Sequence, residues 1–415
     1  MMIERVKGII KANKTIAENF IYITLLQVFL LVAPLITYPY LVKVLGREVY
    51  GMVITAQVLV SYFSIVIDFG SNSIAARYIA LRQGNKDLLS DTLSCILSAR
   101  FYIWCIGFVV YLLIVNLIPS FKEHFLMFLL MFGMTLNDLL FPQFFFQGIE
   151  QMKHITIINL LIKVIFILLI FVFVNEVSDY VLVPLFYSTG YCFGGLFALN
   201  IIHKRFGVRL ALKPINNVIC YIKDCAPLLA KDLIATVKDK FNFFLIGKFV
   251  GMGDVVVYDL CVKFVSVFSK PVGILGTVLL PRFSKYPNSK RQMMIVYLSF
   301  AVSLLLVITA NLFLDKIVFV FLHEHIDLMP IRLILLAPLM LAISQCIGYV
   351  YILANGMNKY MLYSIIIATF TYCICMSITI IADKANSIIP FVLIVLLSYF
   401  TETLYRVYIF LKKKK

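Results

Sequence analysis

Charged side chains recur inside segments of this chain that are otherwise apolar. Segment 221–240 holds seven of them: Lys223, Asp224, Lys231, Asp232, Lys238, Asp239 and Lys240. Asp224, Lys231 and Lys238 are seven residues apart, so a helix places them on one stripe. An ionisable group in hydrocarbon is costly unless it is paired or hydrated. The segment therefore predicts an amphipathic membrane helix whose polar face is turned toward protein or water.

A second apolar segment, 255–280, repeats this pattern with Asp259, Lys263 and Lys270 on one helical face. In the first half, Arg100, Asp138 and Lys163 lie about ten residues inside apolar segments. Basic residues in such places could line a hydrated, cationic cavity for an anionic ligand. The candidates for that cavity are Arg100, Lys163, Lys231, Lys238, Lys263 and Lys270.

The acidic residues in the same segments leave two interpretations open. Asp138, Asp232, Asp239 and Asp259 are candidates for coupling to protons or sodium ions. The alternative is that they pair with Lys residues of neighbouring helices and only fix the packing. Arg100 likewise could snorkel or cap a neighbouring helix instead of facing a cavity.

The composition indicates the class of protein in which these charged side chains lie. Of the 415 residues, 62% are apolar and 14% are charged, and the mean hydropathy is +0.99. This balance excludes a soluble enzyme, a nucleic-acid-binding domain and a disordered tail. Because one transmembrane helix takes about 20 apolar residues, the apolar residues of this chain are enough for about twelve transmembrane helices. We therefore expect an all-α, polytopic membrane protein.

The apolar runs are continuous rather than alternating, which favours helices over strands. Twelve helical ranges are predicted: 19–42, 50–75, 93–116, 125–147, 155–174, 181–202, 219–247, 255–280, 292–314, 331–353, 360–382 and 388–410. The polar start leads into a first span rather than a cleavable signal peptide.

The basic residues of the connecting segments indicate the orientation. In this layout 22 of the 37 Lys and Arg residues fall on the side of the two termini, and six fall on the opposite side. The positive-inside rule then predicts that both termini are cytoplasmic. If 219–247 did not span, the basic segments 282–291 and 412–415 would face outward, so we expect that this helix also spans.

A short internal repeat suggests two halves. Lys43-Val-Leu-Gly46, ending at Tyr50, is similar to Lys248-Phe-Val-Gly251, ending at Tyr258, at an offset of about 205 residues. We therefore predict two six-helix lobes, 1–210 and 211–415, around a central cavity.

The sequence carries no motif typical of an enzyme or of a metal site. The sequence has no P-loop, and the short outward segments carry no Asp-x-Asp pair. The nine cysteines contain no C-x-x-C spacing, and His323 and His325 flank Glu324 in a segment expected to be a solvated loop. We expect no enzymatic activity, no metal and no cofactor.

Several motifs resemble a known family. They are Pro39-Tyr40, the run Leu45-Gly-Arg-Glu-Val-Tyr-Gly51, Asp68-Phe-Gly70, Arg77-Tyr-Ile-Ala80, and in the second half Gly251 to Asp259 with Leu280-Pro-Arg-Phe-Ser284. In order and spacing they resemble bacterial polysaccharide-repeat-unit flippases, which serve O-antigen, capsule or exopolysaccharide synthesis within the multidrug/oligosaccharidyl-lipid/polysaccharide exporter superfamily.

This resemblance implies alternating access between two lobes. It also implies that an oligosaccharide linked to undecaprenyl pyrophosphate moves from the inner to the outer leaflet of the bacterial cytoplasmic membrane. A polysaccharide polymerase and a chain-length regulator would be partners beside the membrane lipids, and no nucleic acid would be bound. Three alternatives stay open: a flippase for a peptidoglycan or teichoic-acid lipid precursor, a multidrug exporter of the same fold, and a membrane transferase or polymerase.

Overall fold

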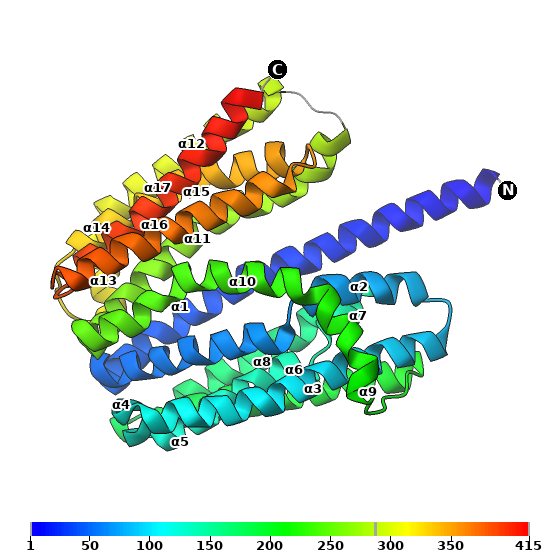
Figure 1. Ribbon diagram of the computed structural model, residues 1–415, viewed down its shortest axis with the longest axis horizontal. Helices are drawn as coiled ribbons and strands as arrows, with labels where there is room; N and C mark the ends of the chain where they lie inside the picture. The colour runs from blue at the N-terminus through cyan, green and yellow to red at the C-terminus, as the bar shows by residue number, and fades with distance from the viewer. Residues whose placement is uncertain (1, 286–288, 414–415) are drawn as a thin grey trace. The chain divides into compact units, whose positions relative to one another are not determined.

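The computed structural model describes residues 2–285 and 289–413, and helices make up nearly all of this part of the chain (Figure 1). It contains no strand, which confirms the all-α prediction. The chain divides into two compact units. Unit 1 comprises Met1–Leu45 and Ala56–Leu233, and unit 2 comprises Gly46–Thr55 and Ile234–Lys415. The predicted division into 1–210 and 211–415 stays a prediction.

Unit 1 contains most of the first long helix and all helices up to the middle of α10. Their bounds are α1 (Met2–Asp68), α2 (Ser71–Arg82), α3 (Lys86–Leu117), α4 (Pro119–Glu123), α5 (Phe125–Phe132), η1 (Gly133–Thr135), α6 (Leu136–Leu140), α7 (Gln143–Gly148), α8 (Met152–Phe173), η2 (Val177–Val181), α9 (Leu182–Phe206) and α10 (Ile215–Phe249). The core of this unit is rich in phenylalanine, and Phe144, Phe145 and Phe146 are fully buried in it.

Unit 2 contains the second part of α10 and the remaining helices. Their bounds are α11 (Met252–Lys285), α12 (Ser289–Leu312), α13 (Leu314–Leu322), α14 (Met329–Ile334), α15 (Ala337–Cys346), the π-helical segment η3 (Ile347–Leu353), α16 (Asn358–Ile381) and α17 (Ile388–Lys413). Helices α16 and α17 pack against each other, and Cys346, Tyr351 and Phe410 lie in the core of this unit.

Two glycines with positive φ interrupt the helices, one between two predicted ranges and one inside a predicted range. Gly46 breaks α1 with φ 73° and ψ 164°, between the predicted ranges 19–42 and 50–75. Gly70 has φ 70°, and a Cβ atom there would lie 2.7 Å from Leu228 Cβ. A residue with a side chain would strain the backbone at either position. The predicted helix 50–75 is therefore split into the end of α1 and the start of α2.

The repeated segments contact each other within unit 2. A Cβ atom on Gly51 would lie 1.9 Å from the carbonyl oxygen of Met252, so the backbones are packed closely there. Arg47 pairs with Glu324 at 3.0 Å and donates to the carbonyl of Gly253. Gly46 and Gly251, equivalent in the repeat, both have positive φ and both stand between helices. Equivalent backbone breaks support the internal duplication.

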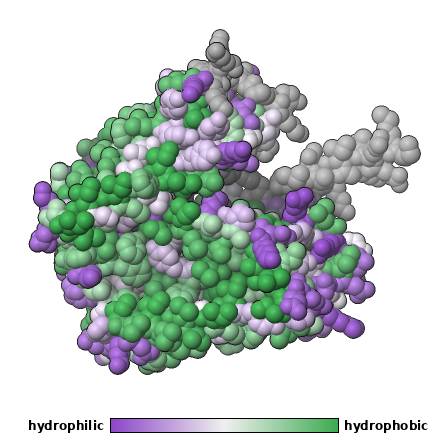
Figure 2. Space-filling view, viewed as in Figure 1, coloured by the Kyte–Doolittle hydropathy of each residue, from purple (hydrophilic) through white to green (hydrophobic). Residues whose placement is uncertain are grey.

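The helices suit a membrane protein that crosses the bilayer several times. Nine segments of the described chain are long and apolar enough to span, among them Lys86–Leu117, Met152–Phe173 and Asn358–Ile381. The predicted helix 219–247 is helical as α10, but its charges keep it outside these nine, so its passage through the membrane stays a prediction. Figure 2 shows hydrophobic residues over the middle of the face in view and hydrophilic residues toward helix ends.

Candidate functional site

Arg100 of α3 is the largest fully buried side chain in unit 1, with 1% of its surface exposed. Its guanidinium pairs with the Asp68 carboxylate and donates to the Ser71 hydroxyl and to the carbonyl oxygen of Asp138. It also lies 5.0 Å from the centre of the Phe144 ring. All of these contacts hold it inside the helix packing of unit 1. Its position therefore matches a structural ion pair better than a cavity wall.

Asp138 lies in the same polar cluster, on α6. Its carboxyl group hydrogen-bonds to Ser64 and is near the charges of Arg100 and Asp68. The side-chain oxygen of the preceding Asn137 is buried without a hydrogen-bond partner in the described part of the chain. The cluster thus brings two acids and one base together around the end of α1, and its role in ion coupling stays a prediction.

Lys163 of α8 has a different environment. Its ammonium lies over the rings of Tyr187 and Tyr191 of α9, at 4.8 Å and 5.3 Å from their centres, and 5.9 Å from that of Phe166. Among the described residues, no carboxylate lies within ion-pair distance of it. Aromatic faces attract a cation but do not neutralise it. Lys163 also hydrogen-bonds to the side chain of Tyr191, and it is a half-buried positive charge with no carboxylate partner among the described residues.

Lys238 of α10 is buried in unit 2, with 5% of its surface exposed. Its ammonium lies 3.2 Å from Asp239 Oδ1 and 3.6 Å from Glu402 Oε2 of α17. Glu402 in turn pairs with Arg406 at 2.6 Å. Arg406 also donates to the Ser364 hydroxyl and to the carbonyl oxygen of Ser344. Lys238 thus belongs to a buried ionic network between helices.

The remaining predicted basic residues also differ in their surroundings. Lys263 pairs with Asp259 one turn earlier on α11. Lys231 lies 3.6 Å from its neighbour Asp232, and both are about half exposed. Lys270 is exposed. Because Lys163 and Lys231 lie in unit 1 while Lys238, Lys263 and Lys270 lie in unit 2, their convergence on one chamber stays a prediction.

Two members of the ionic network did not stand out in the sequence. Arg406 falls in the basic C-terminal segment and Glu402 lies near the same end, so both read as charges at the cytoplasmic boundary. The structure buries them, at 2% and 7% exposure. Their spacing of four residues on one helix, the usual spacing of an ion pair, is the signal that could have found them.

Comparison with known proteins shows what the chain is similar to. The sequence model of a family described as "Polysaccharide biosynthesis protein" matches residues 16–287. A curated protein of Escherichia coli K12 named "Putative O-antigen transporter" is 26% identical over 204 residues, which is 49% of each chain. A protein of Shigella dysenteriae with the same name is 24% identical over 61% of this chain. The aligned segment thus spans about half the length of the Escherichia coli protein and 63% of the length of the Shigella dysenteriae protein.

Solved structures share the fold. The inward-facing and outward-facing conformations of a multidrug-resistance MATE family transporter of the MOP superfamily match with TM-scores of 0.64 and 0.63 at 11% identity. These matches cover 91% and 94% of this chain and 94% and 91% of theirs. A MOP superfamily transporter from Pyrococcus furiosus matches with a TM-score of 0.61 at 12% identity, over 96% of this chain and 97% of its own. Similarity at this level of identity establishes the architecture alone.

Proposed function

We propose, because the chain belongs to the polysaccharide biosynthesis protein family, that it is a transporter of a lipid-linked polysaccharide precursor. The match of the family model to residues 16–287 carries this proposal. The transporter names of the two curated relatives and the fold shared with MOP superfamily transporters support it.

The substrate we propose is an oligosaccharide repeat unit on undecaprenyl pyrophosphate, moved from the inner to the outer leaflet of the cytoplasmic membrane by alternating access. Its sugars and pyrophosphate are polar, so they do not cross hydrocarbon without a protein path. A cation in the membrane could hold the pyrophosphate while the prenyl chain stays in lipid. Both termini would be cytoplasmic, in keeping with the basic loops on their side.

Lys163 is the residue we propose for contact with the pyrophosphate. Arg100, Lys238 and Lys263 each have an acidic partner, so an anionic ligand would have to compete with it. Lys163 faces aromatic rings instead, and no described carboxylate pairs with it. A phosphate oxygen would give its ammonium a charge-assisted hydrogen bond. Coupling to protons or sodium, and partnership with a polymerase and a chain-length regulator, belong to the same proposal.

A deletion strain tests the transport proposal. Loss of this protein should abolish the surface polysaccharide while lipid-linked repeat units accumulate on the inner leaflet. A deletion strain with normal surface polysaccharide would contradict the proposal. A requirement of the gene for growth in a strain that makes no such polysaccharide would favour a peptidoglycan precursor as the substrate instead.

Variants in the deletion strain test Lys163. Lys163→Met should lower surface polysaccharide at an unchanged protein level, and Lys163→Arg should restore much of it because the charge is kept. Lys122→Met, an exposed lysine on α4, is the matched control. Full activity of Lys163→Met would remove Lys163 from the proposed site and leave the transport proposal standing.

A further inference from the structure

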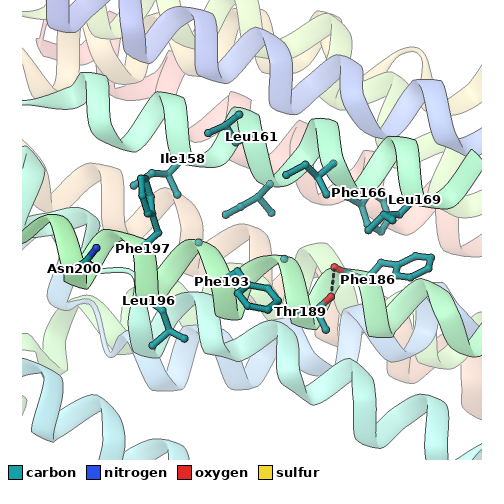
Figure 3. Close-up of a pocket in the computed structure, with 14 residues that line it drawn as sticks. Ile158, Leu161, Phe166, Leu169, Phe186, Thr189, Phe193, Leu196, Phe197 and Asn200 are labelled. Carbon is teal, nitrogen blue, oxygen red and sulfur yellow. Dashed lines mark hydrogen bonds between the residues drawn. The ribbon is translucent and has the colours of Figure 1, made fainter.

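A long apolar groove runs along the outside of the α8–α9 helix pair in unit 1 (Figure 3). Its volume is about 720 Å³. Figure 3 shows Ile158 and Asn200 toward one end of the groove and Leu169 and Phe186 toward the other. Several lining side chains are well exposed, including Phe193 at 73% and Leu161 at 51%. The groove is thus open to the surroundings of the protein.

Two glycines make the groove possible. A Cβ atom on Gly194 would lie 2.2 Å from Ile162 Cδ1, and one on Gly190 would lie 3.2 Å from Ile162 Cγ2. Because these positions have no side chains, α9 packs closely on Ile162 of α8, and the larger side chains beside the two glycines line the groove. Small residues allow this close approach of membrane helices.

The groove continues into a basic cluster at one end. On α9 the lining positions Phe193, Phe197 and Asn200 are followed on the same face by Lys204, four residues after Asn200. On α8 the position one turn before Ile158 is His154. Helices α8 and α9 pack against each other, and Arg205 of α9 lies near His154. Lys204 and Arg205 are exposed.

The dimensions suit one hydrocarbon chain. From Phe186 to Asn200 a helix rises about 21 Å, and from Ile158 to Leu169 about 16 Å. One leaflet of the hydrocarbon core is about 15 Å thick. A chain that fills the groove would bring its headgroup to the turn that carries Lys204 and Arg205, where a negative charge would be attracted.

From the groove and its basic end we infer a binding site for an anionic phospholipid, with one acyl chain between α8 and α9 and the phosphate at Lys204 and Arg205. Lys163, Tyr187 and Tyr191 do not line the groove, although Phe166, whose ring lies 5.9 Å from the Lys163 ammonium, does. The lipid site does not depend on the transport proposal. A lipid held there would brace the α8–α9 pair, which carries the aromatic rings around Lys163.

Native mass spectrometry of the full-length protein in detergent, with added phosphatidylglycerol or phosphatidylethanolamine, tests this site. We expect the wild type to bind phosphatidylglycerol more tightly. The double substitution Lys204→Gln and Arg205→Gln should weaken that binding about 25-fold, at about fivefold for each charge. Lys122→Gln, at an exposed lysine outside the groove, should leave it unchanged.

A second pair of variants tests the groove. Leu161→Trp should fill it and weaken binding of both lipids, whereas Leu168→Trp, at a position 60% exposed on the same helix but outside the lining, should not. Equal binding of both lipids by the wild type, or phosphatidylglycerol binding that none of the groove and charge variants alters, would overturn the inference. Displacement of phosphatidylglycerol by an equal concentration of undecaprenyl phosphate would also overturn it, because the groove would then belong to a prenyl lipid.

Discussion

Replacement of Arg100 by methionine distinguishes a structural ion pair from a ligand-binding charge. The substitution keeps an apolar stem against Phe144 but removes the cation that faces Asp68 and the donors to Ser71 and to the carbonyl of Asp138. A buried charge that loses its partner costs about 3–5 kcal/mol. Because the Asp68 side chain keeps 22% exposure, we expect the low end, about 3 kcal/mol.

A second variant also removes the Asp68 carboxylate that Arg100→Met leaves without its partner. In the double variant Arg100→Met with Asp68→Asn, no unpaired carboxylate is left, so stability should return to within about 1–2 kcal/mol of the wild type. Arg209→Met, at an exposed arginine, should change stability by less than about 0.5 kcal/mol.

Thermal unfolding of the purified protein, followed by size-exclusion chromatography, measures these differences. At about 2–4 °C per kcal/mol for a unit of this size, Arg100→Met should lower Tm by roughly 6–12 °C. An unchanged Tm for Arg100→Met would refute the assignment of Arg100 to the packing of unit 1. A double variant no more stable than the single one would show that the charge of Asp68 is not the cause of the loss.

Two further predictions concern unit 2 and use the same thermal assay. Glu402→Gln removes the negative charge that faces the buried Lys238 and Arg406, so it should lower the free energy of unfolding by about 3–5 kcal/mol. Glu324→Gln removes only the exposed partner of Arg47, so it should lower the free energy of unfolding by about 1 kcal/mol at most. Equal losses would contradict this. Gly51→Ala should be strongly destabilising because its Cβ would collide with the backbone of Met252, and Gly84→Ala, with open space around it, should be neutral or mildly stabilising. A stable Gly51→Ala protein would show that these backbones can separate without loss.

The helices and the family could be predicted from the sequence because their signals are local. A run of about 20 apolar residues is enough to indicate a membrane helix, and each of the twelve predicted ranges contains helix. The motifs around Gly46, Gly70 and Gly251 lie in the segment 16–287 that the family model matches. The break of the predicted helix 50–75 at Gly70 is not visible in the local sequence, because Gly70 packs against Leu228, a residue more than 150 positions away.

The pairing of the charges needed the structure for a physical reason. Periodicity places a charge on a face of its helix, but which opposite charge it meets depends on the rotation and depth of the neighbouring helix. Arg100 illustrates this: its position on α3 is clear from the sequence, but its partners Asp68 and Ser71 lie at the end of α1 and the start of α2. Lys163 and Lys238 are similar lysines in sequence and both lie over aromatic rings, yet only Lys238 has described carboxylate partners, Asp239 and Glu402.

The amino-acid sequence by itself determined that the chain is helical and membrane-embedded, and which family it resembles, because hydropathy and short motifs need no partner from elsewhere in the chain. Only the tertiary structure decided which charges within the apolar segments have an oppositely charged partner and where the apolar groove of α8 and α9 lies. The ion pair of Arg100 with Asp68, the aromatic contacts of Lys163 and the groove all form between side chains of different helices, so they depend on how those helices pack.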